Sequence, residues 1–249
     1  MNQTPIYIIN LESSLDRKEY IKKQFNTYQD SIHYTFFPAI NGNKEKEFYL
    51  FKKYNKAKRF LRKGNIMSFS QLGCFASHYL LWEKCIELNK GIIILEDDAI
   101  LQDNFLDVYK FCTSDENSFE FFWLSPPAFE KMNGEHTLKI KNSNTELIKF
   151  VGKHDNATGY YITPQSAKKL LDYCQEWIYE VDITMDRFWE NRLNILNVNP
   201  PCVKPSFEFK TNIEVDKNKK NRTVKIRLLR EYYKLIDIVK KAIYLRMKH

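Results

Sequence analysis

Short apolar runs recur along the chain, and turn residues bound most of them. Their length and their β-branched or aromatic content are typical of buried strands. They predict strands over Ile6–Ile9, Ile32–Pro38, Gly91–Leu95, Phe119–Pro127 and Gly159–Ile162. The stretch KMNGEHTLKIKN, from Lys131 to Asn142, predicts a hairpin or a loop.

The segments between these runs carry apolar residues at helical spacing. Ser13 and Asp16 form the pattern of a capping box, which predicts a helix directly after the first strand. One face of the next helix carries Phe75, Tyr79, Trp82 and Ile86. We expect that helix to end at Asn89–Gly91, where a turn signal interrupts the pattern.

Two further helices are predicted in the second half of the chain. Thr163 is expected as an N-cap with Pro164 at the first helical position, where a missing amide costs nothing. The stretch VDITMDRFWENRL, from Val181 to Leu193, predicts a shorter helix. Strands that alternate with helices predict an α/β fold with a mostly parallel central sheet flanked by helices.

The strand predicted at Gly91–Leu95 runs straight into three carboxylates, Glu96, Asp97 and Asp98. Ligands in α/β sheets bind at the carboxyl ends of strands, where these acids are expected. Adjacent like charges repel one another unless a cation or a shared proton intervenes. The functional interpretation is a hard divalent cation held by carboxylate oxygens and bridged to a substrate's phosphates. The alternative is a solvated turn without a ligand.

The composition limits the class of protein. A chain of 249 residues with 43% hydrophobic residues can form one substantial folded domain. Its seven glycines show neither a Walker-type nor a dinucleotide-type pattern, which argues against a glycine-rich phosphate loop. Five scattered cysteines without a Cys-x-x-Cys motif indicate reduced, mostly buried thiols of a cytoplasmic protein rather than a disulfide framework or a zinc site. The stretch MNQTPIYIINL lacks the features of a secretory signal, and no apolar run approaches the roughly 20 residues of a membrane span.

Positive charge is concentrated in two segments. From Lys217 to His249 there are 12 of the 39 Lys and Arg residues but only two of the 31 acids. We therefore divide the chain into a catalytic domain, residues 1–216, and a basic tail, residues 217–249. A second basic block runs from Lys44 to Gly64, and we expect it to lie near the acceptor substrate and to favour anionic glycans.

Several motifs together carry a resemblance to a known family. GCFASHYLLWEKC followed by GIIILEDDAIL resembles the central signature of glycosyltransferase family 25, which includes bacterial lipooligosaccharide and collagen-type sugar transferases. The flanking stretches YIINLESSLDR, FPAING, GYYITPQSAKKLL and VDITMD resemble further elements of that family in the same order. Because the matches are ordered across roughly Pro5–Asn199, they are more specific than any one motif. The tail has no match.

The resemblance implies a GT-A fold, a UDP-sugar donor, a Mn²⁺ (or Mg²⁺) cofactor and transfer with inversion. It implies metal binding by Glu96 and Asp98, which have the spacing of an Asp-x-Asp motif, and donor binding by Glu96 and Asp97. Glutamate at the first position departs from that motif, so Asp98 is the stronger candidate ligand. The resemblance also implies a hexose, galactose in particular, and a lipooligosaccharide or related lipid-linked acceptor.

An inverting transfer needs a carboxylate that takes the proton of the attacking hydroxyl. Asp182 and Asp186 lie four residues apart, on one face of the predicted helix, and both are candidates. We favour Asp182 because it matches the Val-Asp element of the family. The alternatives are a helix-capping role for Asp182, and for Asp186 an ion pair with Arg187 or Lys169.

Other candidate donor-binding residues lie at strand ends. Asn10 and Arg17 follow the first strand, where a GT-A fold receives uridine and phosphate, although Arg17 also fits a helix-surface charge. Tyr160 is a candidate donor contact, and because neighbouring strand residues point to opposite faces, at most one of Tyr160 and Tyr161 faces the site. For His78 we expect a hydrogen-bonded role supporting the acid-bearing strand rather than a metal ligand.

The basic tail places Leu228, Leu229, Tyr232, Leu235, Ile236, Val239 and Ile243 at helical spacing. A basic amphipathic helix is typical of peripheral attachment to anionic lipid. We therefore predict a bacterial cytoplasmic protein on the cytoplasmic face of the inner membrane. The alternative is a terminal helix docked on the domain or in a dimer interface. Nucleic-acid binding is not predicted, because no binding module accompanies the charge. The rival functions are a metal-dependent phosphohydrolase or nucleotidyltransferase, and a non-enzymatic membrane-surface binding module.

Overall fold

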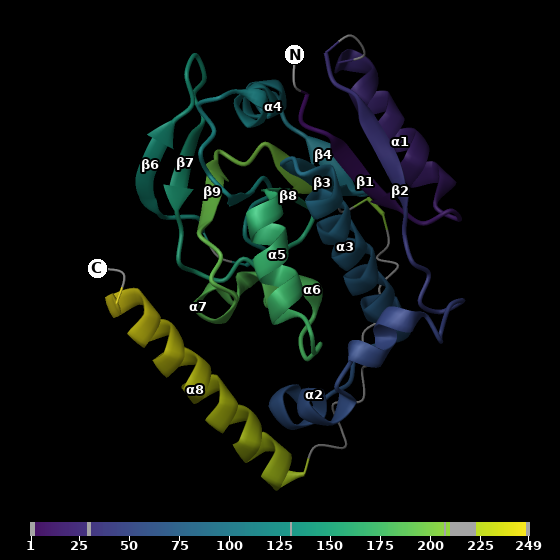
Figure 1. Cartoon of the computed structure of the whole chain (residues 1–249), viewed down its shortest axis with the longest axis vertical. Helices are drawn as coiled ribbons and strands as arrows, with labels where there is room; N and C mark the ends of the chain where they lie inside the picture. Colours follow the sequence, from purple (N-terminus) through teal and green to yellow (C-terminus); the bar gives the residue numbers. More distant parts are fainter. Residues whose placement is uncertain (1–2, 29–30, 130, 207, 210–222, 248–249) are drawn as a thin grey trace.

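The computed structural model describes residues 3–28, 31–129, 131–206, 208–209 and 223–247. The strands of its central sheet are β1 Ile6–Asn10, β2 Tyr34–Pro38, β3 Ile92–Glu96, β5 Phe121–Trp123, β6 Glu135–Lys139, β7 Glu146–Lys149, β8 Gly159–Ile162 and β9 Ile195–Asn199. They lie in the order β2-β1-β3-β8-β5-β9-β7-β6 (Figure 1). A separate two-stranded sheet pairs β4 Ala99–Leu101 with β10 Val203–Pro205.

The direction of the strands confirms a mostly parallel sheet. β1 pairs parallel with both β2 and β3, and β5 pairs parallel with β9. β8 is antiparallel to β3 and β5, and β7 is antiparallel to β9 and β6. Six of the eight strands therefore point the same way, and only β8 and β7 are reversed.

The helices are α1 Leu15–Phe25, α2 Lys56–Lys63, α3 Phe69–Leu88, α4 Phe105–Thr113, α5 Pro164–Tyr173, α6 Val181–Asp186, α7 Phe188–Asn191 and α8 Val224–Met247. Two 3₁₀ turns complete the described elements, η1 Asn26–Tyr28 and η2 Tyr49–Lys53. α3 and α5 pack side by side against one face of the sheet (Figure 1). α1 and α4 pack against the other face.

Alternating side chains of β1 divide the core into two clusters. Tyr7 and Ile9 join the cluster beneath α3 and α5, whereas Ile6 and Ile8 join the cluster beneath α1 and α4. Every residue of β1 is buried, so both clusters pack directly against this strand. The carboxyl end of this strand is therefore held rigidly from both sides.

The predicted strands are all present, and most predicted helix ends are confirmed. The stretch from Lys131 to Asn142 contains β6, which forms a hairpin with β7. Asn89 ends α3 in the left-handed conformation with φ 48°, as expected from the stop signal. Thr163 is the N-cap of α5, and Pro164 is its first residue.

Two expectations about helices were wrong in detail. Ser14, not Ser13, is the N-cap of α1, so Ser13 and Asp16 do not form a capping box. A capping box does form at the start of α3, between Ser68 and Gln71. The helix expected over Val181–Leu193 is broken at Arg187 into α6 and α7. Ile86 lies on the same helical face as Phe75, as expected, but is 38% exposed.

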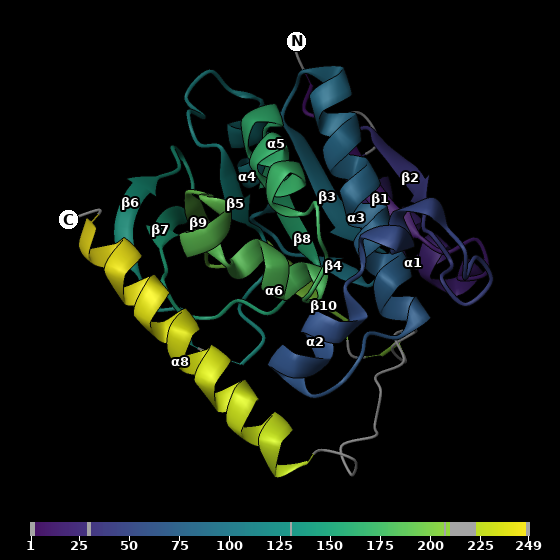
Figure 2. The same cartoon turned by 60° about the horizontal axis from the view of Figure 1, so that its bottom comes forward.

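The described part of the tail contains one long helix, α8, at the edge of the molecule (Figure 2). Arg187 donates to both carboxylate oxygens of Asp237 on α8, at 2.8 and 2.6 Å, and Ile226 and Tyr244 are buried. α8 contacts α2 and α7. The predicted boundary between Asp216 and Lys217 lies outside the described residues. Within the described residues, no helix is both long and apolar enough to cross a bilayer.

Candidate active site

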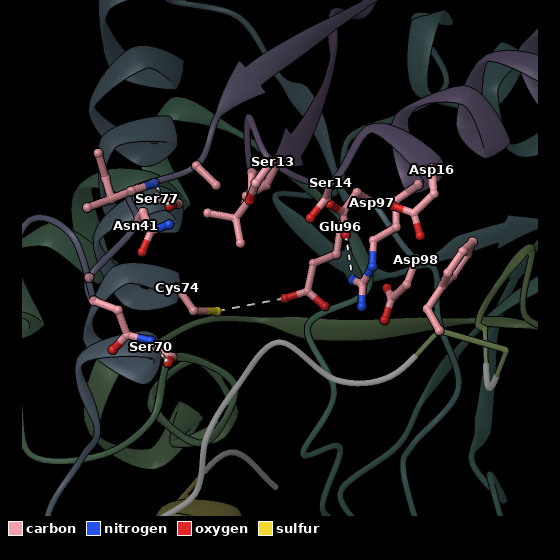
Figure 3. A pocket seen from close by; sticks show the side chains of 18 of the residues that line it. Ser13, Ser14, Asp16, Asn41, Ser70, Cys74, Ser77, Glu96, Asp97 and Asp98 are labelled. Atoms are coloured by element: carbon pink, nitrogen blue, oxygen red, sulfur yellow. Dashed lines mark hydrogen bonds and ion pairs between the residues drawn. The ribbon is translucent and has the colours of Figure 1, made fainter.

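The three carboxylates at the end of β3 diverge into different environments. Glu96 is the last residue of the strand, and Asp97 and Asp98 form the turn that leads into β4. Figure 3 shows the Glu96 side chain between Cys74 and Asp98, at the rim of a cleft. The three carboxylates are therefore adjacent in the sequence but have different surroundings in the structure.

Asp97 is held by the protein itself. Asn10 Nδ2 donates to Asp97 Oδ2 and Arg17 Nη1 donates to Asp97 Oδ1, both at 2.8 Å. Burial raises the pKa of Asp97, while the bonds from Arg17 and Asn10 oppose that rise. Asn10 and Arg17, two of the predicted donor-binding residues, thus both bond to a third, Asp97. These bonds fix the turn that carries Asp98.

Asp98 differs because its side chain is not satisfied. Asp98 Oδ1 is buried and has no hydrogen-bond partner among the described residues. Burial, followed by the charges of Glu96 and Asp97, raises the pKa of Asp98 to about 7. An orphaned carboxylate oxygen beside a second carboxylate is what a hard divalent cation requires. Glu96 and Asp98 therefore fit the predicted metal site.

Glu96 is oriented from the α3 side. Its Oε1 lies 3.9 Å from Cys74 Sγ and 3.4 Å from His78 Nε2. Behind it, His78 Nδ1 lies 2.8 Å from the Tyr160 hydroxyl, which accepts a hydrogen bond from Trp82 Nε1 at 3.0 Å. Because the Tyr160 hydroxyl accepts from Trp82, it can donate to His78, whose other nitrogen then donates to Glu96. His78 is buried and supports the acid-bearing strand, as the sequence predicted.

Tyr160 itself does not reach the cleft. It is fully buried in the cluster beneath α3, and Tyr161 is buried in the cluster on the opposite face. The two tyrosines alternate faces as expected, but the structure places Tyr160 behind Glu96 and not against the space in which a donor would lie.

The large cleft beside the acids has a volume of about 620 Å³. Three segments line it besides the acids: the loop from Leu11 to Arg17, the turn from Ala39 to Asn43, and the outer face of α3 at Ser70, Cys74 and Ser77. Glu208 and Phe209 close its far side, and the Arg17 guanidinium lies 5.3 Å from the centre of the Phe209 ring. These segments come from distant parts of the sequence.

Two glycines allow the turn after β2 to approach α3. A Cβ on Gly73 would lie 2.3 Å from the carbonyl oxygen of Ile40, and a Cβ on Gly42 would lie 1.8 Å from that of Phe69. Ser77 then accepts a hydrogen bond from the Ile40 amide at 2.9 Å. Only backbone without side chains fits this contact, so the two glycines set one wall of the large cleft.

A small cleft of about 260 Å³ lies on the other side of Glu96. It is lined by Gln71, Cys74, Glu96, Asp155, Asn156, Ala157, Glu180, Val181 and Asp182. Glu96 and Cys74 line both clefts, so the two spaces meet at these side chains. Arg59 of α2 donates to Glu180 at 2.6 Å, which ties the predicted basic block to the wall of the small cleft.

The two candidate bases are not equivalent. Asp182 lines the small cleft, and its Oδ1 accepts from the Ile183 amide at 2.8 Å. Asp186 is not among the residues that line either cleft, and its Oδ2 accepts from the His154 amide at 3.3 Å. Burial raises the pKa of each carboxyl to about 7. Of these two carboxyls, only Asp182 combines a raised pKa with access to the space beside Glu96.

Sequence reasoning missed Cys74, Glu208 and Phe209. Cys74 was part of a quoted motif, and its i, i+4 spacing to His78 was a signal that could have been used. Glu208 and Phe209 reach the large cleft because β10 pairs with β4 and the Ser206 amide donates to the Asp98 carbonyl at 2.8 Å. No local pattern reports that pairing.

With this geometry established, comparison with known proteins gives the family. The family model described as "Glycosyltransferase family 25 (LPS biosynthesis protein)" matches residues 3–185. The chain belongs to glycosyltransferase family 25. The match includes Glu96, Asp97 and Asp98 of the large cleft and Asp182 of the small cleft. Membership of this family supports an activity as a sugar transferase.

Relatives in this family come from bacteria, insects and a giant virus. The chain is 32% identical over 174 residues to "Lipooligosaccharide biosynthesis protein lic2B" of Haemophilus influenzae, covering 66% of this chain and 61% of the relative. It is 27% identical to a "Glycosyltransferase 25 family member" of Aedes aegypti, covering 69% of this chain and 28% of the relative. It is 29% identical to "Procollagen lysyl hydroxylase and glycosyltransferase" of Acanthamoeba polyphaga mimivirus, covering 67% of this chain and 19% of the relative. The chain thus matches only part of each of these relatives.

Proposed function

We propose that the protein transfers a hexose from a UDP-sugar to a hydroxyl group of a glycan, with inversion and with Mn²⁺ or Mg²⁺ as cofactor. The observation that carries this proposal is the meeting of the two clefts at Glu96. The unsatisfied Asp98 Oδ1 lies on the side of the large cleft, and the Asp182 carboxyl, with its raised pKa, lies on the side of the small cleft. This arrangement would allow a donor in the large cleft to react with an acceptor in the small cleft.

The large cleft is the proposed donor site. Glu96 and Asp98 would hold the cation, which supplies positive charge to the departing diphosphate. Asn10 and Arg17 keep Asp97 in place and thereby hold the turn that presents Asp98. The cleft's position at the carboxyl end of β1 and β3 supports a GT-A assignment, because donors in such folds bind at that edge.

The small cleft is the proposed acceptor site. An acceptor hydroxyl that enters beside Asp182 can give its proton to the ionised carboxylate while its oxygen attacks the sugar carbon. Attack from the small cleft and departure into the large cleft occur on opposite sides of that carbon, which inverts its configuration. The carboxylate must be ionised first, so the raised pKa of Asp182 places its working range near neutral pH.

The acceptor and the sugar are proposed from the family. Relatives named lipooligosaccharide biosynthesis proteins favour a lipooligosaccharide or related lipid-linked acceptor, and we propose galactose as the hexose. Lys63 of α2 interacts electrostatically with Glu180 and Asp155 of the small cleft, which supports the proposal that the basic block lies near the acceptor. We propose that the basic block from Lys44 to Gly64 favours anionic acceptors. If so, neutralising its lysines should remove a preference for phosphorylated over unphosphorylated acceptors.

Attachment to the cytoplasmic face of the inner membrane is the proposed role of α8. One face of the helix docks through Asp237 and Tyr244, and another face exposes apolar side chains. The exposed residues are Val224, Leu228, Tyr232, Leu235, Ile238, Val239, Ile243 and Met247. The many Lys and Arg residues of α8 favour anionic headgroups around this apolar face.

The reaction products test the proposed function. With Mn²⁺ present, we expect UDP to appear together with a glycosylated acceptor, and UDP-galactose to be the best donor in a screen of UDP-hexoses. Release of inorganic phosphate or pyrophosphate would instead indicate a phosphohydrolase or nucleotidyltransferase. Vesicle binding without any turnover of UDP-sugars would indicate a membrane-surface binding module.

A further inference from the structure

Three side chains of different chemistry converge on one point between the two clefts. Cys74 Sγ, His78 Nε2 and a carboxylate oxygen of Glu96 lie within 4.8 Å of one another. Cys74 and His78 are one turn apart on α3, and Glu96 reaches them from the end of β3. Two ligands at i and i+4 of a helix and a third from another element is a common way to build a transition-metal site.

We propose that Cys74, His78 and Glu96 form a binding site for a soft divalent cation, Zn²⁺ in particular, which shares Glu96 with the proposed Glu96–Asp98 site and gives His78 a ligand role that the sequence did not predict. A thiolate, an imidazole and a carboxylate select zinc over manganese or magnesium, because the first two are softer ligands than the oxygens that the harder ions prefer. Three protein ligands leave a fourth tetrahedral position open toward the cleft.

The distances suit this cation. Bonds of about 2.0–2.3 Å in a tetrahedron require donor atoms roughly 3.3–3.8 Å apart. The Glu96 oxygen already lies 3.4 Å from His78 Nε2 and 3.9 Å from Cys74 Sγ. Cys74 Sγ and His78 Nε2 lie within 4.8 Å of each other, so the Cys74 side chain must rotate toward His78 to complete the site.

The surrounding residues hold the ligands in place. His78 is fully buried, and its Nδ1 lies 2.8 Å from the Tyr160 hydroxyl, which Trp82 also contacts. When the cation takes Nε2, the histidine proton sits on Nδ1 and the Tyr160 oxygen accepts it. A second hydrogen bond of this kind commonly orients a metal-bound histidine. The cation replaces the thiol proton of Cys74, which is released to solvent.

Access distinguishes Cys74 from the other cysteines. Cys85, Cys112, Cys174 and Cys202 are all buried, whereas Cys74 is partly exposed and lines both clefts. A cation can therefore enter from the cleft. Cys85, on the same helix, donates to the backbone carbonyls of Lys90 and Ile162 and serves as a matched control.

The test uses the full chain without a polyhistidine tag, and Zn²⁺ or Co²⁺ alone as the probe. We expect one Zn²⁺ per chain in competition with a chromophoric chelator, and a thiolate-to-Co²⁺ charge-transfer band in the near ultraviolet with Co²⁺. Cys74→Ser should remove the band and weaken Zn²⁺ binding at least about a hundredfold, and Tyr160→Phe should weaken it about tenfold. Cys85→Ser should leave both signals unchanged.

Several outcomes would overturn the site. They are Zn²⁺ binding that is equally strong in Cys74→Ser, a Co²⁺ band that depends on Cys85, or no binding by the native chain. His78→Gln adds a second test if thermal unfolding shows that this buried substitution is tolerated, and Cys74→Ser suffices if it is not.

One consequence of the site rests on the proposed function. Because Glu96 belongs to both ligand sets, Zn²⁺ should weaken Mn²⁺-dependent UDP binding in the native chain, and less so in Cys74→Ser. UDP binding that needs Mn²⁺ in a chain that binds no Zn²⁺ would remove only the zinc site. Zn²⁺ binding in a chain that binds no UDP would instead remove the proposed function and leave the zinc site standing.

Discussion

Asp182→Asn is expected to abolish transfer and at the same time to stabilise the fold above neutral pH. The substitution keeps the size of the side chain and an oxygen that can accept from the Ile183 amide. It removes a carboxyl whose pKa is raised by burial and then by the nearby charges of Glu180, Asp155 and Glu96. If Asp182 is the base, the group that lowers stability is the group that the reaction needs.

The magnitude follows from the pKa. The pKa of Asp182 rises from the ordinary 3.8 to about 7 on folding. Between these two pH values the folded chain keeps the proton that the unfolded chain has lost. Asp182 therefore makes its full contribution to the free energy of unfolding below about pH 4, and this contribution is lost as pH rises to about 7. The loss amounts to about 4 kcal/mol at most. Because Asp182 borders an open cleft and solvent screens it, we expect about 1–2 kcal/mol.

Two assays on the same variant check this reasoning. Denaturant unfolding at several pH values should show Asp182→Asn gaining stability over the native chain as pH rises from about 4 to 7. Turnover should fall by about 10²–10⁴-fold, with unchanged Mn²⁺-dependent UDP affinity. Native turnover should rise with pH through about 7, since the base must be ionised.

Asp186→Asn is the matched comparison, because that carboxyl has a similarly raised pKa but does not line either cleft. It should also gain stability with pH and should retain turnover within about tenfold of the native level. An active Asp182→Asn enzyme would refute the assignment of the base, and a variant less stable than the native chain at pH 8 would refute the raised pKa of Asp182.

Two further predictions concern the cleft wall and the tail. Gly73→Ala should lower stability by about 2–3 kcal/mol, because its Cβ would lie 2.3 Å from the Ile40 carbonyl oxygen and the turn must move. Ser70→Ala, which removes one exposed bond from Asn43, should cost no more than about 1 kcal/mol in the same unfolding experiment. Leu235→Glu should reduce binding to vesicles containing anionic lipid about tenfold or more, as expected from burial of one leucine in lipid. Leu15→Glu changes a similarly exposed leucine on α1 and should have no effect; equal loss in both variants would contradict membrane binding through α8.

The strongest local patterns in the sequence predicted much of the fold. The run from Gly91 to Leu95 gave β3 with its acids at the carboxyl end, because four large apolar residues next to carboxylates admit few other arrangements. The stop at Asn89 and the cap at Thr163 were also confirmed, since both depend on chemistry within a few residues. Asp182, chosen from a short motif, does line a cleft beside Glu96.

What the sequence did not reveal depends on distant pairings. β9 and the pairing of β4 with β10 were not predicted, and they bring Glu208 and Phe209 to the large cleft. The different partners of Asp97 and Asp98 were equally hidden, because the turn direction decides which carboxylate meets Arg17 and which remains unsatisfied. Tyr160 could not be placed behind Glu96 without knowing that β8 lies beside β3.

The most direct test of the account is calorimetric binding of UDP with and without Mn²⁺, to the native chain and to Asp98→Asn. We expect tight binding only when both Mn²⁺ and the Asp98 carboxylate are present, because its unsatisfied oxygen is assigned to the cation that holds the diphosphate. Binding that is equal in all four conditions, or absent from all of them, would contradict the assignment of these acids to a metal-dependent donor site.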